Sequence, residues 1–253
     1  MSGTLTMDDL ILGFQDVGLE QGDAALVHSS YKALGDVAGG PRTVVDALLG
    51  AVGEKGTIIM PTFNFDFCSG TPFDARSTPS HMGVLTEIVR QDPRARRVEH
   101  PIYSFAVIGR RASEAATIDD PSSYGRDSLF GKLRDWGGKI MIIGLSYNES
   151  MTFFHHVEEM EGCHYRYMKS FTGDVTDTSG HTERRTVTML VRDLDRGVVT
   201  AVDPMGELLE RSGIITTRPI GDAVVRLMCA RDVYEATARE MRREPHLLYE
   251  YER

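Results

Sequence analysis

Residues 137–159 read GGKIMIIGLSYNESMTFFHHVEE. The paired glycines indicate a turn, and Lys139–Ile143 is a short apolar run typical of a strand that is buried on both faces. A polar segment follows Gly144 and leads into a helical sequence that carries His155 and Glu158. A buried strand followed by reactive side chains on a helix predicts an open α/β sheet that binds its ligands at the carboxyl ends of its strands.

The same pattern occurs earlier in the chain. Ala24–Val27 and Thr57–Met60 are predicted buried strands. Helices are predicted at residues 7–17, at Pro41–Leu49 with Gly53 at its end, and at residues 231–243. We therefore predict an α/β fold, a three-layer α/β/α sandwich around a mostly parallel sheet.

The carboxyl-terminal third has a different texture. Thr182–Arg192 alternates polar and apolar residues, Asp195–Gly197 has the composition of a turn, and Val198–Val202 returns as a second strand. These segments predict an antiparallel β-hairpin excursion. Because the chain shows no internal repeat and no long linker, we expect a single domain over residues 1–253.

Composition and charge exclude several classes of protein. The 253 residues are 41% hydrophobic and 26% charged, which is typical of a globular chain, and a formal net charge of −9 argues against a nucleic-acid partner. Neither a signal peptide nor an apolar run of about 18 residues is present, so we expect a cytoplasmic protein without a membrane partner. The three cysteines are too scattered for a disulfide framework or a paired zinc motif: Cys68, Cys163 and Cys229.

His155 and Glu158 are the strongest candidates for chemistry. Residues three apart on a helix share a face, and a carboxylate there can orient an imidazole that acts as a general base. A surface His–Glu pair without function is the alternative. A second alternative is a metal-dependent hydrolase that uses His155 with His156, Glu159 and His164, although the chain lacks the usual zinc motifs and we expect no metal.

Two further segments combine histidine, hydroxyl groups and free backbone N–H groups. His100 precedes Pro101 at the entry to an apolar run, while His28-Ser29-Ser30 and the helix entry Gly39–Thr43 could hold a phosphate or pyrophosphate. The chain has no Walker motif, no Gly-x-Gly-x-x-Gly and no Gly-x-Ser-x-Gly, and Cys68 lies in no known nucleophile signature.

Six separated motifs occur in a fixed order along the chain. They are Val27–Ser30 with Gly35, the helix entry Val37–Leu48, Gly56–Thr62, Pro72–Asp74 with Thr78–Leu85, Arg96–Ser104, and Asn148–Glu158. In these motifs the chain resembles, over nearly its full length, the aminoglycoside 3-N-acetyltransferase family, which is distinct from the GNAT acetyltransferases. The resemblance implies a single N-acetyltransferase domain that uses acetyl-CoA, without an acyl-enzyme and without a metal.

The resemblance also implies roles for the candidate residues. His155 would be the general base, Glu158 would orient it and stabilise the imidazolium, and His100 would support the same pocket. Coenzyme A would be held by residues of the first motifs and of the His100 segment: His28, Ser29, Ser30, Gly39, Gly40, Thr43 and Ser104. A protein that binds coenzyme A without turnover is a further hypothesis.

The acceptor amine remains open at the level of sequence. Asp66 and Asp74 are candidate substrate-binding residues for an aminoglycoside-like amine, whose acetylation would make this a resistance enzyme. The basic segment with Arg166 and Lys169 suggests the alternative of an anionic biosynthetic amine, such as a nucleotide-linked amino sugar or an aminophosphonate. A homodimer is our hypothesis for the assembly of the chain.

Overall fold

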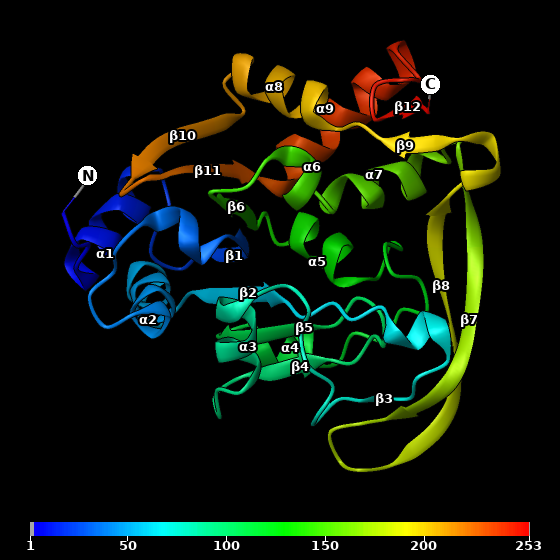
Figure 1. Ribbon diagram of the computed structural model, residues 1–253, viewed down its shortest axis with the longest axis horizontal. Coiled ribbons are helices and arrows are strands. Elements are labelled where there is room, and N and C mark those ends of the chain that lie inside the picture. The colour runs from blue at the N-terminus through cyan, green and yellow to red at the C-terminus, as the bar shows by residue number, and fades with distance from the viewer. Residues whose placement is uncertain (1–2, 253) are drawn as a thin grey trace.

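A seven-stranded mixed sheet forms the centre of the computed structural model, which describes residues 3–252 (Figure 1). β1 pairs in parallel with β2 on one side and with β6 on the other, while the outer strands pair antiparallel with their neighbours. The expected parallel strands therefore form only the middle of the sheet. Its order is β10 (Ile215–Ile220), β11 (Ala223–Cys229), β6 (Lys139–Ile143), β1 (Ala24–Ser29), β2 (Thr57–Pro61), β5 (Phe105–Gly109) and β4 (Arg96–Val98).

Helices cover both faces of this sheet, which confirms the predicted three-layer arrangement. Alternate side chains of β1 point to opposite faces, so Ala25 and Val27 belong to one hydrophobic cluster and Leu26 to the other. The first cluster packs against α1 (Met7–Asp16), α2 (Pro41–Val52) and α3 (Val84–Arg90). The second packs against α5 (Leu129–Asp135), α7 (Phe153–Glu161), α8 (Asp203–Arg211) and α9 (Ala230–Arg243). The shorter helical elements are α4 (Ala112–Ala115), α6 (Tyr147–Ser150) and the 3₁₀ turns at Tyr31–Leu34, Asp66–Ser69 and Leu194–Arg196.

Local sequence signals explain where the amino-terminal helices begin and end. The Thr6 side chain accepts a hydrogen bond from the Asp9 backbone N–H at the start of α1, and the Asp9 carboxylate accepts one from the Thr6 backbone N–H. α2 ends at Gly53, whose φ of 64° favours glycine. None of the helices among residues 3–252 combines the length and the apolar character that a membrane span requires.

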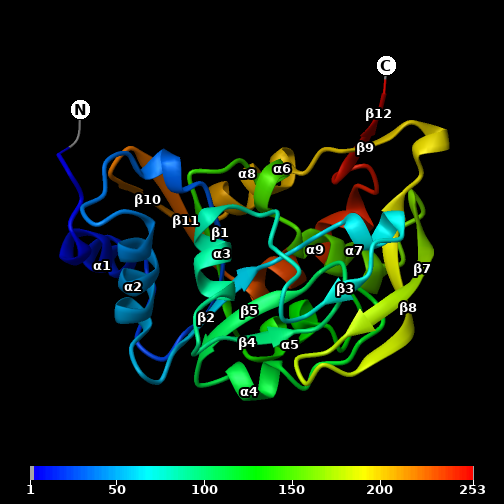
Figure 2. The ribbon, with the colours of Figure 1, turned by 60° about the horizontal axis from the view of Figure 1, so that its bottom comes forward.

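A long antiparallel hairpin confirms the predicted β excursion, but the predicted partner strand was wrong. β8 (Thr182–Arg192) pairs over eleven positions with β7 (Arg166–Thr176), and β3 (Phe73–Asp74) extends this sheet. The turn is fixed by Asp177, whose carboxylate accepts hydrogen bonds from the backbone N–H of His181 and the hydroxyl of Ser179. Figures 1 and 2 show the hairpin at the side of the molecule away from α1 and α2.

The predicted second strand pairs elsewhere. Only Val198–Thr200 is extended, as β9, and it pairs antiparallel with β12 (Tyr249–Tyr251) near the carboxyl terminus. The segment between β8 and β9 is a 3₁₀ turn, so it leads the chain away from β8 instead of reversing it onto that strand. The resulting two-stranded sheet lies beside the start of β7, where Arg166 contacts Thr200.

The sheet topology determines where functional side chains can meet. β1, β2 and β6 are parallel, so their carboxyl ends lie at one edge of the sheet. The chain continues there from β2 to Phe65 and from β6 to Asn148 and α7, and the Ser30 N–H donates to the carbonyl of Ile143 at 2.8 Å. Residues distant in sequence are therefore brought together at this edge.

Candidate active site

The edge of the sheet opens into a cavity of about 470 Å³ that contains His155. Aromatic side chains form one wall, and the ring of Tyr124 packs edge-on against His155 at 5.2 Å between centroids. Residues of β8 and of the segment that follows it also line the cavity. The cavity is lined by Phe65, Tyr103, Tyr124, Asn148, His155, Arg166, Met189, Leu190, Val191, Arg192, Leu194 and Thr200.

His155 is hydrogen-bonded to Glu158 as the helical spacing predicts. His155 Nδ1 lies 2.6 Å from Glu158 Oε2, and the Glu158 side chain is completely buried while that of His155 is 17% exposed. An ionised carboxylate can only accept hydrogen bonds, so Nδ1 carries the proton and donates it. His155 Nε2 is then left with a free lone pair, which is the arrangement of a general base and its orienting carboxylate.

Glu158 is held on both of its oxygen atoms. The Tyr165 hydroxyl donates to Oε1 at 2.7 Å, and Arg166 Nε forms an ion pair with Oε2 at 2.9 Å. Burial by itself raises the pKa of this carboxyl group, but His155, Arg166 and Tyr165 together outweigh burial and hold the pKa of Glu158 below its ordinary value. Glu158 therefore stays ionised inside the protein.

The surroundings of His155 keep its imidazole neutral. Burial lowers its pKa most, the positive charge of Arg166 lowers it further, and the opposite effect of Glu158 does not compensate. The pKa of His155 therefore lies below its ordinary value of 6.5. At neutral pH the ring is unprotonated on Nε2 and able to accept a proton.

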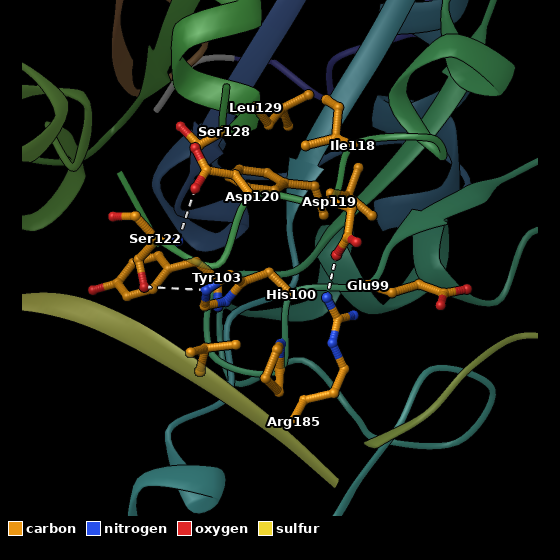
Figure 3. Close-up of a pocket in the computed structure, with 15 residues that line it drawn as sticks. Glu99, His100, Tyr103, Ile118, Asp119, Asp120, Ser122, Ser128, Leu129 and Arg185 are labelled. Atoms are coloured by element: carbon orange, nitrogen blue, oxygen red, sulfur yellow. Dashed lines mark hydrogen bonds and ion pairs between the residues drawn. The ribbon is translucent and has the colours of Figure 1, made fainter. Parts of the chain in front are cut away.

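His100 lies in a different, smaller cavity (Figure 3). Its Nδ1 accepts hydrogen bonds from the backbone N–H groups of Ile102 and Tyr103 at 3.2 and 3.0 Å, and its Nε2 is 3.5 Å from the Ser123 hydroxyl. Burial lowers the pKa of His100 to about 4. Tyr103 lines both cavities, but the structure does not place His100 on the cavity that contains His155.

The hydrogen bonds of His100 lead to a prediction about stability. The His100→Ala variant leaves two backbone N–H groups without their acceptor, so we expect its free energy of unfolding to fall by about 1–3 kcal/mol. His100→Asn should recover much of this loss, because Asn Oδ1 can take the place of Nδ1. Urea unfolding of the three proteins measures the difference. Equal stability of the alanine and asparagine variants would contradict this role.

Five of the predicted coenzyme A residues lie at the end of β1 or at the start of α2. Ser29 and Ser30 are half-buried at the carboxyl end of β1, and Gly39 and Gly40, with φ of 78° and 75°, form the entry to α2. The Thr43 hydroxyl in the first turn of α2 donates to a backbone carbonyl at 2.8 Å. These residues lie at the end of β1 and at the start of α2, at the carboxyl edge of the sheet.

His28 and Ser104 are less accessible than the other predicted coenzyme A residues. His28 is buried in β1, where burial lowers its pKa to about 4, and its Nε2 has no hydrogen-bond partner among the described residues. The Ser104 hydroxyl is buried, donates to the Thr62 carbonyl at 2.7 Å and accepts from Arg97 at 3.0 Å. The structure therefore places Ser104 in an interior hydrogen-bond network and does not present it to a ligand.

The four predicted substrate-binding residues are dispersed. Only Arg166 lines the cavity, and its charge is already paired with Glu158. Lys169 lies on the exposed face of β7 with its ammonium group over a neighbouring aromatic ring. Asp74 forms an ion pair with an arginine at 2.8 Å, and the exposed Asp66 follows Phe65 of the cavity wall.

The side chains of the metal-site hypothesis also point to separate partners. His156 Nδ1 donates to the Tyr124 carbonyl at 2.7 Å, Glu159 accepts from Ser122, and His164 contacts a tyrosine hydroxyl. Within residues 3–252, no three or more His, Cys, Asp or Glu side chains are grouped so that they could hold a metal ion. Burial raises the pKa of the Cys68 thiol, which disfavours the thiolate that a nucleophile requires.

The family model described as aminoglycoside 3-N-acetyltransferase matches residues 26–242. The chain belongs to this family of acyltransferases. Aminoglycoside N(3)-acetyltransferase VII of Streptomyces paromomycinus is 35% identical over an alignment of 179 positions that covers 62% of this chain and 62% of the relative. Aminoglycoside N(3)-acetyltransferase VIII of Streptomyces fradiae is 27% identical, and the match covers 91% of this chain and 90% of the relative.

Solved structures of aminoglycoside acetyltransferases have the same fold. The crystal structure of aminoglycoside acetyltransferase AAC(3)-Xa has a TM-score of 0.84 and 27% identity, covering 97% of this chain and 95% of its own. A structure described as AAC-IIIb binary with CoASH has a TM-score of 0.83 at 23% identity, covering 95% and 97%. Family membership confirms the resemblance and overturns the metal-dependent hydrolase hypothesis.

Several residues of the candidate site were missed at the level of sequence. Tyr165 and Thr200 hold Glu158 and Arg166, and Tyr124 packs on His155, yet all three lie outside the helix that carries the pair. Arg166 was predicted as an anion contact and is instead the ion-pair partner of Glu158. The available signal was the buried acidic residue itself, since a charge inside a protein requires hydrogen-bond donors around it.

Proposed function

We propose that this enzyme transfers the acetyl group of acetyl-CoA directly to a primary amine of an aminoglycoside, with His155 as the general base. The observation that carries the proposal is the hydrogen bond between His155 Nδ1 and the buried Glu158, which leaves Nε2 free beside the cavity. Acetyl-CoA supplies the acetyl group when it is bound.

The chemistry requires a proton acceptor near the amine. An aliphatic ammonium group must lose its proton before the nitrogen can attack a carbonyl carbon, and the neutral His155 Nε2 is suited to accept it. A C–N bond then forms and the C–S bond of the thioester breaks. The nitrogen passes its second proton to the leaving thiolate, and the imidazolium of His155 releases the first proton to solvent. The carboxylate of Glu158 stabilises the imidazolium while it exists, because both partners of their hydrogen bond are then charged, with opposite signs.

The coenzyme is expected along the edge of the sheet formed by the ends of β1 and β6. Ser29, Ser30 and the entry of the 12-residue α2 at Gly39, Gly40 and Thr43 offer hydroxyls and the amino-terminal end of a helix, which favours a phosphate. Within residues 3–252 the Nε2 of His28 has no hydrogen-bond partner, which makes it a candidate contact for a polar ligand at the same place. The neighbour with bound CoASH shares the fold that builds this edge.

The acceptor is proposed to be an aminoglycoside and not an anionic amine. The guanidinium of Arg166, the main argument for an anionic substrate, is occupied by Glu158 and by the Thr200 hydroxyl. The net charge of −9 favours the approach of a polycation, and Asp66 is exposed next to the cavity wall. Acetylation of such a substrate would give the protein a role in antibiotic resistance.

Release of the coenzyme A thiol from acetyl-CoA tests the proposal. We expect turnover with 2-deoxystreptamine aminoglycosides and none with phosphate-bearing amino sugars or aminophosphonates, and mass spectrometry of the product should show one added acetyl group. Turnover with the phosphate-bearing set alone would contradict the proposed acceptor. Calorimetric binding of coenzyme A without turnover on either set would replace the transferase by a coenzyme A-binding protein.

A further inference from the structure

The two-stranded sheet of β9 and β12 contacts the residues that hold Glu158. In this sheet Thr200 and Tyr249 are directly paired across the strands. Tyr249 contacts Tyr165, and Thr200 contacts Arg166, the next residue and the first of β7. Tyr165 and Arg166 are the residues that bind the carboxylate of Glu158.

One line of contact runs through stacked aromatic rings. The rings of Tyr165 and Tyr249 are 3.8 Å apart between centroids with an interplanar angle of 19°, and both side chains are buried. The Tyr165 hydroxyl donates to Glu158 Oε1 at 2.7 Å, whereas the Tyr249 hydroxyl lies 3.1 Å from His164 Nε2 and does not reach the carboxylate. Tyr249 therefore acts on Glu158 only by fixing the plane of the Tyr165 ring.

The second line of contact runs through the guanidinium of Arg166. Its terminal nitrogen donates to the Thr200 hydroxyl at 3.0 Å, and its Nε lies 2.9 Å from Glu158 Oε2. The Arg166 side chain is only 4% exposed, so solvent does not compete for these contacts. The guanidinium is thus held at one end by β9 and forms an ion pair with the carboxylate at the other.

We propose that the β9–β12 sheet, through Thr200 and Tyr249, is a positioning element that fixes the carboxylate of Glu158 and so sets the orientation and tautomer of His155. The catalytic consequence rests on the proposed role of His155 as the base. A carboxylate that is free to rotate would present His155 Nδ1 with a variable acceptor, and the imidazole would populate both tautomers. The Nε2–H tautomer cannot accept a proton from the amine.

The groups that face His155 come from several elements and must be considered together. Glu158 lies on the same helix, Arg166 and Arg192 lie on the paired strands β7 and β8, and Tyr124 contributes an uncharged ring. Tyr249 and Thr200 carry no charge at neutral pH. Their replacement therefore changes geometry around His155 and leaves the set of neighbouring charges intact.

The Tyr249→Ala variant tests the proposal in two independent ways. We expect kcat to fall by about 10-fold or more with little change in KM for the amine, because a misplaced base slows the chemical step. We also expect the ¹⁵N shifts of the His155 ring in the free protein to change from a single Nδ1–H tautomer to a mixture. The signals are assigned by comparison with a His155→Gln variant.

Conservative variants separate positioning from a general loss of structure. Tyr249→Phe keeps the stacked ring and should recover most of the kcat that Tyr249→Ala loses. Glu250→Gln changes an exposed residue of the same strand whose side chain lies on the opposite face from Tyr249, so it should leave kcat and the His155 tautomer unchanged. If Tyr249→Ala does not fold, Thr200→Val provides the test and Thr200→Ser its rescue, since serine restores the hydroxyl that Arg166 binds.

The outcomes distinguish this proposal from the proposed function. An unchanged tautomer and unchanged kcat in folded Tyr249→Ala or Thr200→Val would overturn the positioning role. An inactive wild-type protein would overturn the transferase proposal instead. The ¹⁵N measurement needs no substrate, so a change of tautomer in the variants would still support the positioning role in that case.

Discussion

Replacing His155 by alanine is expected to lower kcat for aminoglycoside acetylation by about 10² to 10⁴-fold, the usual contribution of a positioned general base. The reason is geometric, because His155 Nε2 is the free basic nitrogen of a ring whose other nitrogen is held by Glu158 at 2.6 Å. KM for acetyl-CoA should change little, since His155 is proposed to contact the amine. Steady-state release of the coenzyme A thiol measures both constants.

Two further variants control this experiment. His155→Gln retains a polar side chain of similar size without a basic nitrogen, so it should be as inactive as the alanine variant. His181→Ala removes an exposed histidine at the tip of the β7–β8 hairpin, far from Glu158 along the strands, and should retain wild-type kcat. Circular dichroism establishes that each variant is folded. Near wild-type kcat in folded His155→Ala would remove His155 from the mechanism.

The elements that the sequence predicted well are those with strong local signals. The strands of the buried middle of the sheet, such as Lys139–Ile143, are continuous apolar runs because both of their faces are covered by helices. The capping box of Thr6 and the terminal glycine Gly53 mark helix ends through contacts within one turn. Such signals need no knowledge of distant parts of the chain.

Strand pairing was less predictable because it depends on contacts that are remote in sequence. The alternation in Thr182–Arg192 correctly predicted a strand, but its partner Arg166–Thr176 reads as a mixture of basic, aromatic and polar residues with no clear period. Most of β7 is exposed, so burial imposes little pattern on it. The choice of partner follows from the turn at Asp177, whose role is visible only in its hydrogen bonds.

In the candidate site, too, contacts within one helix were predicted and contacts between distant segments were not. The pair of His155 and Glu158 was predicted because both residues lie on one turn of one helix. The binding of Glu158 by Tyr165 and Arg166, and the support of these by Tyr249, involve a strand and a carboxyl-terminal segment that no local pattern links to α7. A charged group buried on a helix predicts that partners exist, but not which residues they are.

Acidification below neutral pH is expected to destabilise the enzyme strongly through three buried histidines. Burial lowers the pKa of His28, His100 and His156 to about 4, whereas the unfolded chain binds the same protons near 6.5. Well above pH 6.5 these residues are neutral in both states and do not change the free energy of unfolding. As the pH falls toward 4, these histidines are protonated in the unfolded state but remain neutral in the folded state. The free energy of unfolding therefore decreases by about 2 kcal/mol for each residue at pH 5.

Urea unfolding at about pH 7.5 and about pH 5 measures this loss, in a range where most carboxyl groups are still ionised. His156→Asn removes the titrating group, while its amide nitrogen can still donate to the Tyr124 carbonyl in place of Nδ1. Its stability should therefore depend less on pH than that of the wild type, by about 2 kcal/mol across this range, even if it is less stable at both values. His181→Asn, at an exposed position, should show the wild-type dependence. If His156→Asn and the wild type lose the same stability between the two pH values, protonation of His156 in the unfolded chain does not contribute to acid unfolding.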